Sequence, residues 1–102
     1  MITRARRRVV WTSPAEEDLT VAALWYGDKQ PTLVELFLGA IRTAAQRAAD
    51  SPALYARVRG DVRRVLVRRF PYALTFRESA EDILVLSCYH LHRDPSTWQS
   101  SG

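Results

Sequence analysis

The sequence predicts an α+β domain in which a helical hairpin packs on a mostly antiparallel sheet, with its elements in the order β-α-α-β-β-β. Two stretches with apolar residues at helical spacing come early in the chain, and three stretches with strand-like alternation follow them. Helices that are segregated from strands along a chain are typical of α+β domains. A length of 102 residues allows a single domain, residues 1–102, with a basic, frayed start at 1–8 and a tail at 99–102.

The first strand and the first helix meet at a capping signal. Residues 9–12, Val-Val-Trp-Thr, are typical of a short strand. Ser13 follows, with Pro14 and Glu16 at the spacing of a capping box, so we expect Ser13 to cap a helix that ends near Gly27. The apolar stripe of this helix consists of Ala15, Leu19, Ala22 and Tyr26.

Three further apolar residues of the same helix, Val21, Leu24 and Trp25, lie off that stripe. The first helix is therefore apolar on more than one side. Two interpretations remain open: these side chains form a surface for a partner protein, or they belong to the core that faces the sheet.

A second helix is expected from about Thr32 to Ala49. Residues 27–31 form a turn, a second capping box begins at Thr32, and Asp50-Ser51-Pro52 ends the helix. Its buried stripe consists of Val34, Phe37, Ile41, Ala44 and Ala48. Because the turn is short, the two helices should form an αα-hairpin.

Three strands are expected at residues 62–69, 72–78 and 83–91, after a connection over 53–60. A Phe-Pro step breaks the first strand from the second, and a polar turn joins the second to the third. The last strand begins Ile-Leu-Val-Leu, which is apolar on both faces, so we place it inside the sheet.

Arginine dominates the charge, and it is concentrated around the first of these three strands. The net charge is +4, and residues 57–69 contain six arginines and one acid. Guanidinium groups bind carboxylates and phosphates through paired hydrogen bonds. Two interpretations apply: an edge strand kept from aggregating by charge, or a docking surface for an acidic protein segment or a phosphate backbone.

Several other functional classes find no support in the sequence. The single cysteine, Cys88, excludes an intramolecular disulfide and a zinc site of cysteines, and it fits a reducing, cytoplasmic compartment. No apolar run is long enough to cross a bilayer, and no glycine-rich phosphate loop is present. His90, His92 and Asp94 come nearest to a metal-binding set, but polar residues at the end of a strand are the simpler interpretation. We expect no metal, no cofactor and no membrane partner.

The strand region resembles a known family. Residues 68–77, Arg-Arg-Phe-Pro-Tyr-Ala-Leu-Thr-Phe-Arg, and residues 89–98, Tyr-His-Leu-His-Arg-Asp-Pro-Ser-Thr-Trp, resemble the second half of ParE-type toxins of the RelE/ParE superfamily, which belong to type II toxin–antitoxin systems. The first half is also similar, through Ser-Pro-Ala-Glu-Glu-Asp-Leu at 13–19. The resemblance covers residues 9–98, nearly the whole chain, and implies the same helical hairpin on an antiparallel sheet.

The resemblance also implies a toxin that arrests growth and is neutralised by a cognate antitoxin. ParE-like members poison DNA gyrase, whereas RelE-like members cleave mRNA on the ribosome. The gyrase branch is favoured here because Ala73 follows Tyr72, where the ribonuclease branch typically has an arginine, and because the sheet region has no lysine. A ribosome-dependent, metal-independent ribonuclease is the alternative, and a member that keeps only antitoxin binding is the third hypothesis.

Each hypothesis points to its own residues. Metal-free RNA cleavage needs a cation for the charge on phosphorus and a group for proton transfer. Arg64 and Arg93 would be the cations, and Tyr89 or His90 would transfer the proton. For the antitoxin we expect the second apolar side of the first helix and the arginine-bearing segment to serve as binding surfaces. These two surfaces comprise Val21, Leu24, Trp25, Arg57, Arg59, Arg63, Arg64 and Arg68.

Overall fold

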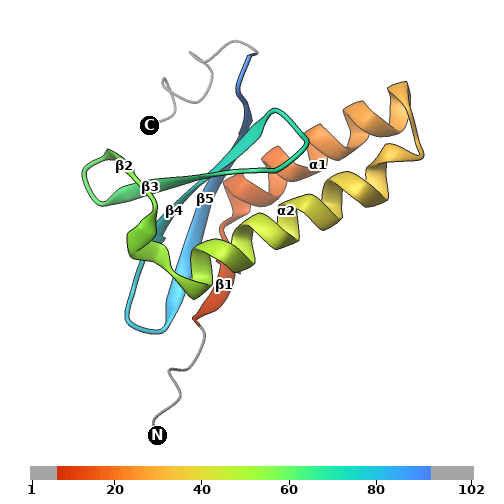
Figure 1. Ribbon diagram of the computed structural model, residues 1–102. Helices are drawn as coiled ribbons and strands as arrows, with labels where there is room; N and C mark the ends of the chain where they lie inside the picture. Colours follow the sequence, from red (N-terminus) through yellow and green to blue (C-terminus); the bar gives the residue numbers. More distant parts are fainter. Residues whose placement is uncertain (1–6, 93–102) are drawn as a thin grey trace, which may run out of the picture.

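The computed structural model describes residues 7–92, in which two helices lie along one face of a five-stranded sheet (Figure 1). The elements are β1 (Arg8–Trp11), α1 (Ser13–Lys29), α2 (Leu33–Asp50), the 3-10 turn η1 (Pro52–Leu54), β2 (Arg57–Arg59), β3 (Val62–Leu66), β4 (Tyr72–Glu78) and β5 (Asp82–His90). The strand order is β1-β5-β4-β3-β2, and every pair is antiparallel except β1 with β5. The predicted α+β class, with a helical hairpin on a mostly antiparallel sheet, is confirmed.

The strand β2 is missing from the predicted order, which treats residues 53–60 as a connection. All three residues of β2 are exposed, so no apolar alternation marks them as a strand. They become a strand because β3 offers a free edge with which they pair. β3 is therefore an interior strand, and its interpretation as a charged edge strand is wrong. β3 also ends at Leu66 rather than residue 69, because the chain turns at Arg69, which has a φ of 73°.

The helix boundaries differ from the prediction by one or two residues. Thr12, and not Ser13, caps α1: its Oγ1 accepts the Ala15 N–H at 3.4 Å and donates to the Val85 carbonyl at 2.8 Å. The cap therefore also ties the helix to β5. α1 continues to Lys29, two residues beyond Gly27. α2 begins at Leu33, and Thr32 makes no side-chain cap bond, so the second capping box is wrong.

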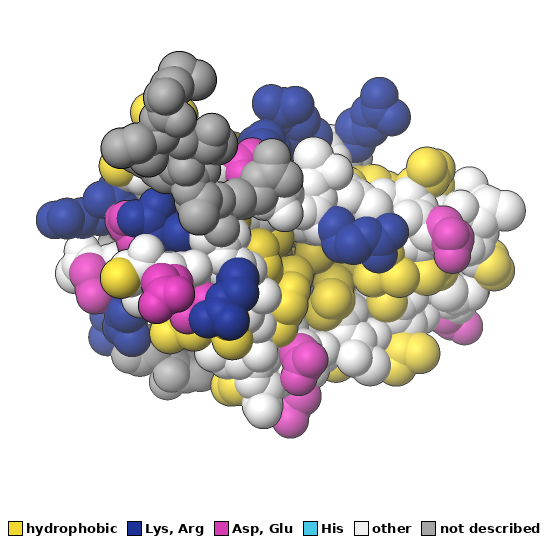
Figure 2. Space-filling view, turned by 90° about the horizontal axis from the view of Figure 1, so that it is seen from below, with side chains coloured by type: hydrophobic (Ala, Val, Ile, Leu, Met, Phe, Trp, Pro, Cys, Tyr) yellow, Lys and Arg dark blue, Asp and Glu magenta, His cyan; other side chains and the backbone are white. Residues whose placement is uncertain are grey.

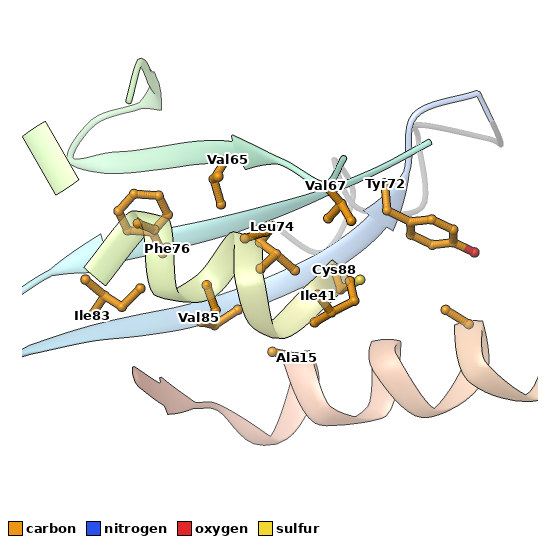
Figure 3. Close-up of a cluster of buried hydrophobic side chains, with 14 of the residues drawn as sticks. Ala15, Ile41, Val65, Val67, Tyr72, Leu74, Phe76, Ile83, Val85 and Cys88 are labelled. Atoms are coloured by element: carbon orange, nitrogen blue, oxygen red, sulfur yellow. The ribbon is translucent and has the colours of Figure 1, made fainter. Parts of the chain in front are cut away.

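The core lies between the helices and the sheet face that they cover (Figure 3). On β4 and β5, the side chains of Leu74, Phe76, Ile83 and Val85 are fully buried on this face. The predicted helical stripes supply the other layer, since Tyr26 and Phe37 are buried along with the alanines of both stripes. In α2 these alanines let the helix approach the sheet closely. One core thus joins both helices to the strands.

An aromatic cluster connects the helical hairpin to the loop between β3 and β4. The Tyr26 ring lies 4.9 Å from that of Phe37 and 5.4 Å from that of Phe70, measured between centroids. Tyr72 joins them from the start of β4, with its ring 5.0 Å from Phe37. The pairs of Tyr26 with Phe70 and of Phe37 with Tyr72 are edge-to-face, a geometry that adds to the energy of burial. None of the helices in residues 7–92 is long and apolar enough to cross a membrane.

Asp18 links α1 to the part of β5 that β1 does not reach. β1 pairs with β5 only as far as Trp11 opposite Val85. Farther along β5, no described strand accepts the backbone N–H of Cys88 on that side, and this N–H donates to the Asp18 carboxylate at 3.1 Å. The helix thus supplies the acceptor that a neighbouring strand would otherwise provide.

Candidate functional site

Apolar side chains of α1 form an exposed surface on the helical hairpin. Val21 is 66% exposed, Leu24 68% and Trp25 41%. Their interpretation as core that faces the sheet is therefore wrong. Figure 2 shows hydrophobic side chains gathered on the half of the view occupied by the helices, with charged groups around them. An exposed apolar surface of this kind is typical of a site that binds another protein.

A groove of about 680 Å³ between the two helices adjoins this surface. Its lining is mostly apolar and comes from both helices: Leu19, Thr20, Ala23, Leu24, Gly27, Asp28, Val34 and Leu38. Leu24 is shared by the groove and the exposed surface. The sequence predicted Leu24 as a binding residue but not Val34 or Leu38. Helical spacing alone does not show which half-buried positions of two different helices line the same groove. A groove of this shape suits the apolar face of an amphipathic helix.

The sheet face away from the helices holds a small polar cluster. Arg64 of β3 donates through Nη1 to the Tyr89 hydroxyl of β5 at 3.3 Å. Between them in the register lie Thr75 and Ser87, whose hydroxyl oxygens are 2.5 Å apart. Two of the residues predicted for RNA chemistry, Arg64 and Tyr89, are thus brought together. Thr75 and Ser87 were missed, because only the strand register places them there.

The other residues predicted for RNA chemistry do not join this cluster. His90 lies on the opposite face of β5 from Tyr89, with its ring 5.1 Å from that of Tyr72. Arg93 lies outside the described residues. Ala73 is fully buried opposite Tyr89 in the register, so no second arginine side chain extends from this position.

The two histidines stay close but form no metal site in the described residues. The His92 N–H donates to Nδ1 of His90 at 3.0 Å, and no group of three or more possible ligands occurs within residues 7–92. Asp94, the third residue of the weak metal-binding set, lies outside the described residues.

The arginines predicted for antitoxin binding do not form one surface. Arg57 and Arg59 are exposed on the edge strand β2, and Nη1 of Arg63 donates to the carbonyl of Tyr55, the residue after η1, at 2.6 Å. Arg64 lies on the open sheet face. Arg68 is exposed in the loop between β3 and β4. The alternation of β3 thus separates neighbouring arginines onto opposite faces of the sheet.

Cys88 is not suited to nucleophilic chemistry. Burial, together with the nearby Asp18 carboxylate, raises the pKa of its thiol to about 12. The thiolate, which is the reactive form, is therefore scarce at neutral pH. Asp18 itself has a raised pKa, mainly because it is partly desolvated; the Cys88 N–H opposes this shift and the Glu17 charge adds to it.

Comparisons with known proteins agree with this fold. Residues 9–95 match the family model described as the ParE toxin of the type II toxin–antitoxin system parDE. A solved chain of the chromosomal ParDE toxin–antitoxin system from P. aeruginosa superposes with a TM-score of 0.74 and 19% identity, over 85% of this chain and 98% of that one. A chain of the RelBE2 toxin–antitoxin complex from Mycobacterium tuberculosis gives a TM-score of 0.59 and 18% identity, over 86% and 94%. No curated protein matches significantly.

Proposed function

Because the chain belongs to the ParE toxin family of type II toxin–antitoxin systems, we propose that it arrests growth by binding and poisoning DNA gyrase and that a cognate antitoxin neutralises it. The observation that carries this proposal is the family match over residues 9–95, which include both helices, β2 to β5 and all of β1 except Arg8. The surroundings of Tyr89 on the open sheet face support it further. Among the described residues, Arg64 is the arginine that contacts Tyr89, and Ala73 is buried beside it.

The gyrase proposal is tested with the purified full chain in a supercoiling assay. We expect supercoiling to stop and cleaved DNA to accumulate, because a protein that holds gyrase in a cleaved state blocks religation. The same reaction with chain that has been incubated with its antitoxin is the control, and it should supercoil normally. No inhibition at a large excess of the chain would rule out gyrase as the target.

For the antitoxin, we propose that an amphipathic helix occupies the groove between α1 and α2. The support is the apolar lining of the groove and the 68% exposure of Leu24, which lines it. Docked apolar anchors at the centre of such interfaces contribute about 2 kcal/mol or more each. We therefore expect Leu24→Glu to weaken binding of the co-expressed antitoxin roughly thirtyfold in calorimetry.

The matched control for this substitution is Leu54→Glu. Leu54 is 80% exposed on η1 and does not line the groove, so the same change of charge there should leave the affinity nearly unchanged. Equal losses in both variants would show that added negative charge, and not the groove, is responsible.

A second candidate function, cleavage of ribosome-bound mRNA, is supported by the contact between Arg64 and Tyr89. A guanidinium beside a phenol offers a cation for the charge on phosphorus and a group for proton transfer. If this activity exists, Tyr89→Phe should reduce cleavage by about 10²-fold or more, whereas His90→Ala, on the other face, should not. Tyr55→Phe is the control. Intact mRNA in translating extracts, with supercoiling inhibited, would exclude the ribonuclease.

A further inference from the structure

Two arginines lie side by side at the edge of the sheet. Arg57 of β2 is the register partner of Arg63 of β3. The Arg64 N–H donates to the Ala56 carbonyl at 3.1 Å, which makes Arg57 and Arg63 a pair without mutual backbone hydrogen bonds. Opposed side chains are closest in such pairs, and like charges in this position repel. The register therefore places the two arginine side chains next to each other, where their like charges repel.

Neither arginine has a carboxylate partner within residues 7–92. Arg63 donates to the Tyr55 carbonyl, and Arg57 is exposed. The two acids nearby are engaged elsewhere, since Glu78 pairs with Arg7 at 2.9 Å and Asp61 with Arg77 at 3.0 Å. The positive charge of this pair is thus not compensated by the described part of the chain.

The two arginines line one pocket of about 340 Å³. The other lining residues are Arg7, Asp61, Glu78, Ser79 and Ala80. The volume holds the head of one acidic side chain and leaves room for several waters, since a water takes about 30 Å³. The carboxylates of Asp61 and Glu78 at the same pocket disfavour a continuous phosphate backbone, which carries a charge at every nucleotide. A single carboxylate is therefore the anion that fits best.

The free edge of β2 offers backbone groups to a chain segment that could carry such a carboxylate. A residue in a pair without mutual hydrogen bonds directs its own N–H and C=O away from the partner strand. For Arg57 that direction is the free edge of the sheet, because no described strand lies beyond β2. A residue that pairs with Arg57 from outside has its side chain on the same face as Arg57 and Arg63. The irregular register between Arg57 and Arg59 limits this pairing to the Arg57 end.

We propose that the β2 edge binds an extended, acidic segment of a protein partner and that one carboxylate of this segment occupies the Arg57–Arg63 pocket. The backbone of the segment pairs with Arg57, and its acidic side chain relieves the repulsion between the two guanidinium groups. The proposal rests on the proposed function only in that the antitoxin would supply the segment.

The test is an amide and arginine-side-chain NMR titration of the full chain with a synthetic peptide. The probe is a capped heptapeptide of alternating threonine and valine with one central glutamate, and its partner has glutamine at the centre. We expect the glutamate peptide to shift the signals of Arg57 and Arg63 and to bind roughly fivefold more tightly than the glutamine peptide. Arg57→Gln should remove this preference, whereas Arg42→Gln, at an exposed position of α2, should preserve it.

Three results would overturn the proposal: no binding up to about 5 mM peptide, equal affinity of the two peptides, or shifts that map away from β2. Tighter binding of a short single-stranded RNA, lost in Arg57→Gln, would instead assign the pocket to phosphate. None of these results depends on gyrase, so the failure of this proposal is distinguishable from the failure of the toxin function.

Discussion

At the scale of single residues, Asp18 joins α1 to β5 through a hydrogen bond, but its carboxylate is partly desolvated there. Its carboxylate accepts the Cys88 N–H, which no strand within residues 7–92 accepts. Its pKa is raised from 3.8 because partial burial disfavours the charged form. The native protein therefore holds this proton more tightly than the unfolded chain. Proton binding at Asp18 therefore stabilises the folded state. This contribution is fully present below pH 3.8 and is lost as the pH rises through the raised pKa of Asp18.

We expect Asp18→Asn to be at least as stable as the parent chain near neutral pH. The amide oxygen can still accept the Cys88 N–H, and no charge is desolvated. The advantage should shrink in acid, where Asp18 is itself protonated. Asp18→Ala should instead lose about 1–3 kcal/mol, because the Cys88 N–H is left without an acceptor. Urea unfolding at several pH values measures both effects, and an advantage of Asp18→Asn that grows in acid would contradict the assignment.

Arg69 has a strained backbone conformation, because its φ of 73° lies in the left-handed region. Glycine adopts this conformation without the steric penalty of a side chain. We expect Arg69→Gly to leave the free energy of unfolding equal or raise it by up to about 1 kcal/mol. Arg68→Gly is the control, and it should destabilise slightly because it only adds freedom to the unfolded chain. Urea midpoints compare the two variants, and a lower midpoint for Arg69→Gly than for Arg68→Gly would refute the strain.

At the scale of elements, the helical hairpin presents an apolar surface that the described part of the chain leaves exposed. Substituting Val21 and Leu24 together by glutamate should leave the free energy of unfolding within about 0.5 kcal/mol, because both side chains are mostly exposed. The same change should reduce self-association, which sedimentation velocity measures. A large loss of stability would mean that these side chains belong to the core after all.

The sequence predicts the elements that have their own periodicity and misses those that depend on a partner. The stripes through Tyr26 and Phe37 are regular, so both helices and their buried faces follow from spacing. The strand β2 has no apolar alternation and forms only against β3. The contact between Arg64 and Tyr89 joins residues 25 positions apart and depends on the registers of β3, β4 and β5, with an irregularity between Thr75 and Phe76. Strand alternation puts Tyr89 and His90 on opposite faces, but the sequence could not show which of the two shares a face with Arg64.

At the scale of the whole molecule, a single core makes the helices and the sheet dependent on each other. Phe37 is fully buried where α2 meets the aromatic residues of α1 and β4. Its neighbour Leu36 is 60% exposed on the same helix. Substitutions at Phe37 test the contribution of the shared core to the free energy of unfolding. Substitutions at Leu36 test the contribution of the helix alone.

We expect Phe37→Ala to destabilise the chain by about 3–5 kcal/mol, a large part of the roughly 5–15 kcal/mol typical of a domain. Far-UV circular dichroism and tryptophan fluorescence should report the same urea midpoint in the parent chain, because helices and sheet unfold together. In Phe37→Leu, which removes less buried volume than Phe37→Ala, both midpoints should fall together, while Leu36→Ala should barely move either. If the dichroism midpoint alone fell, part of the secondary structure would unfold separately from the surroundings of the tryptophans, and the single shared core would be wrong.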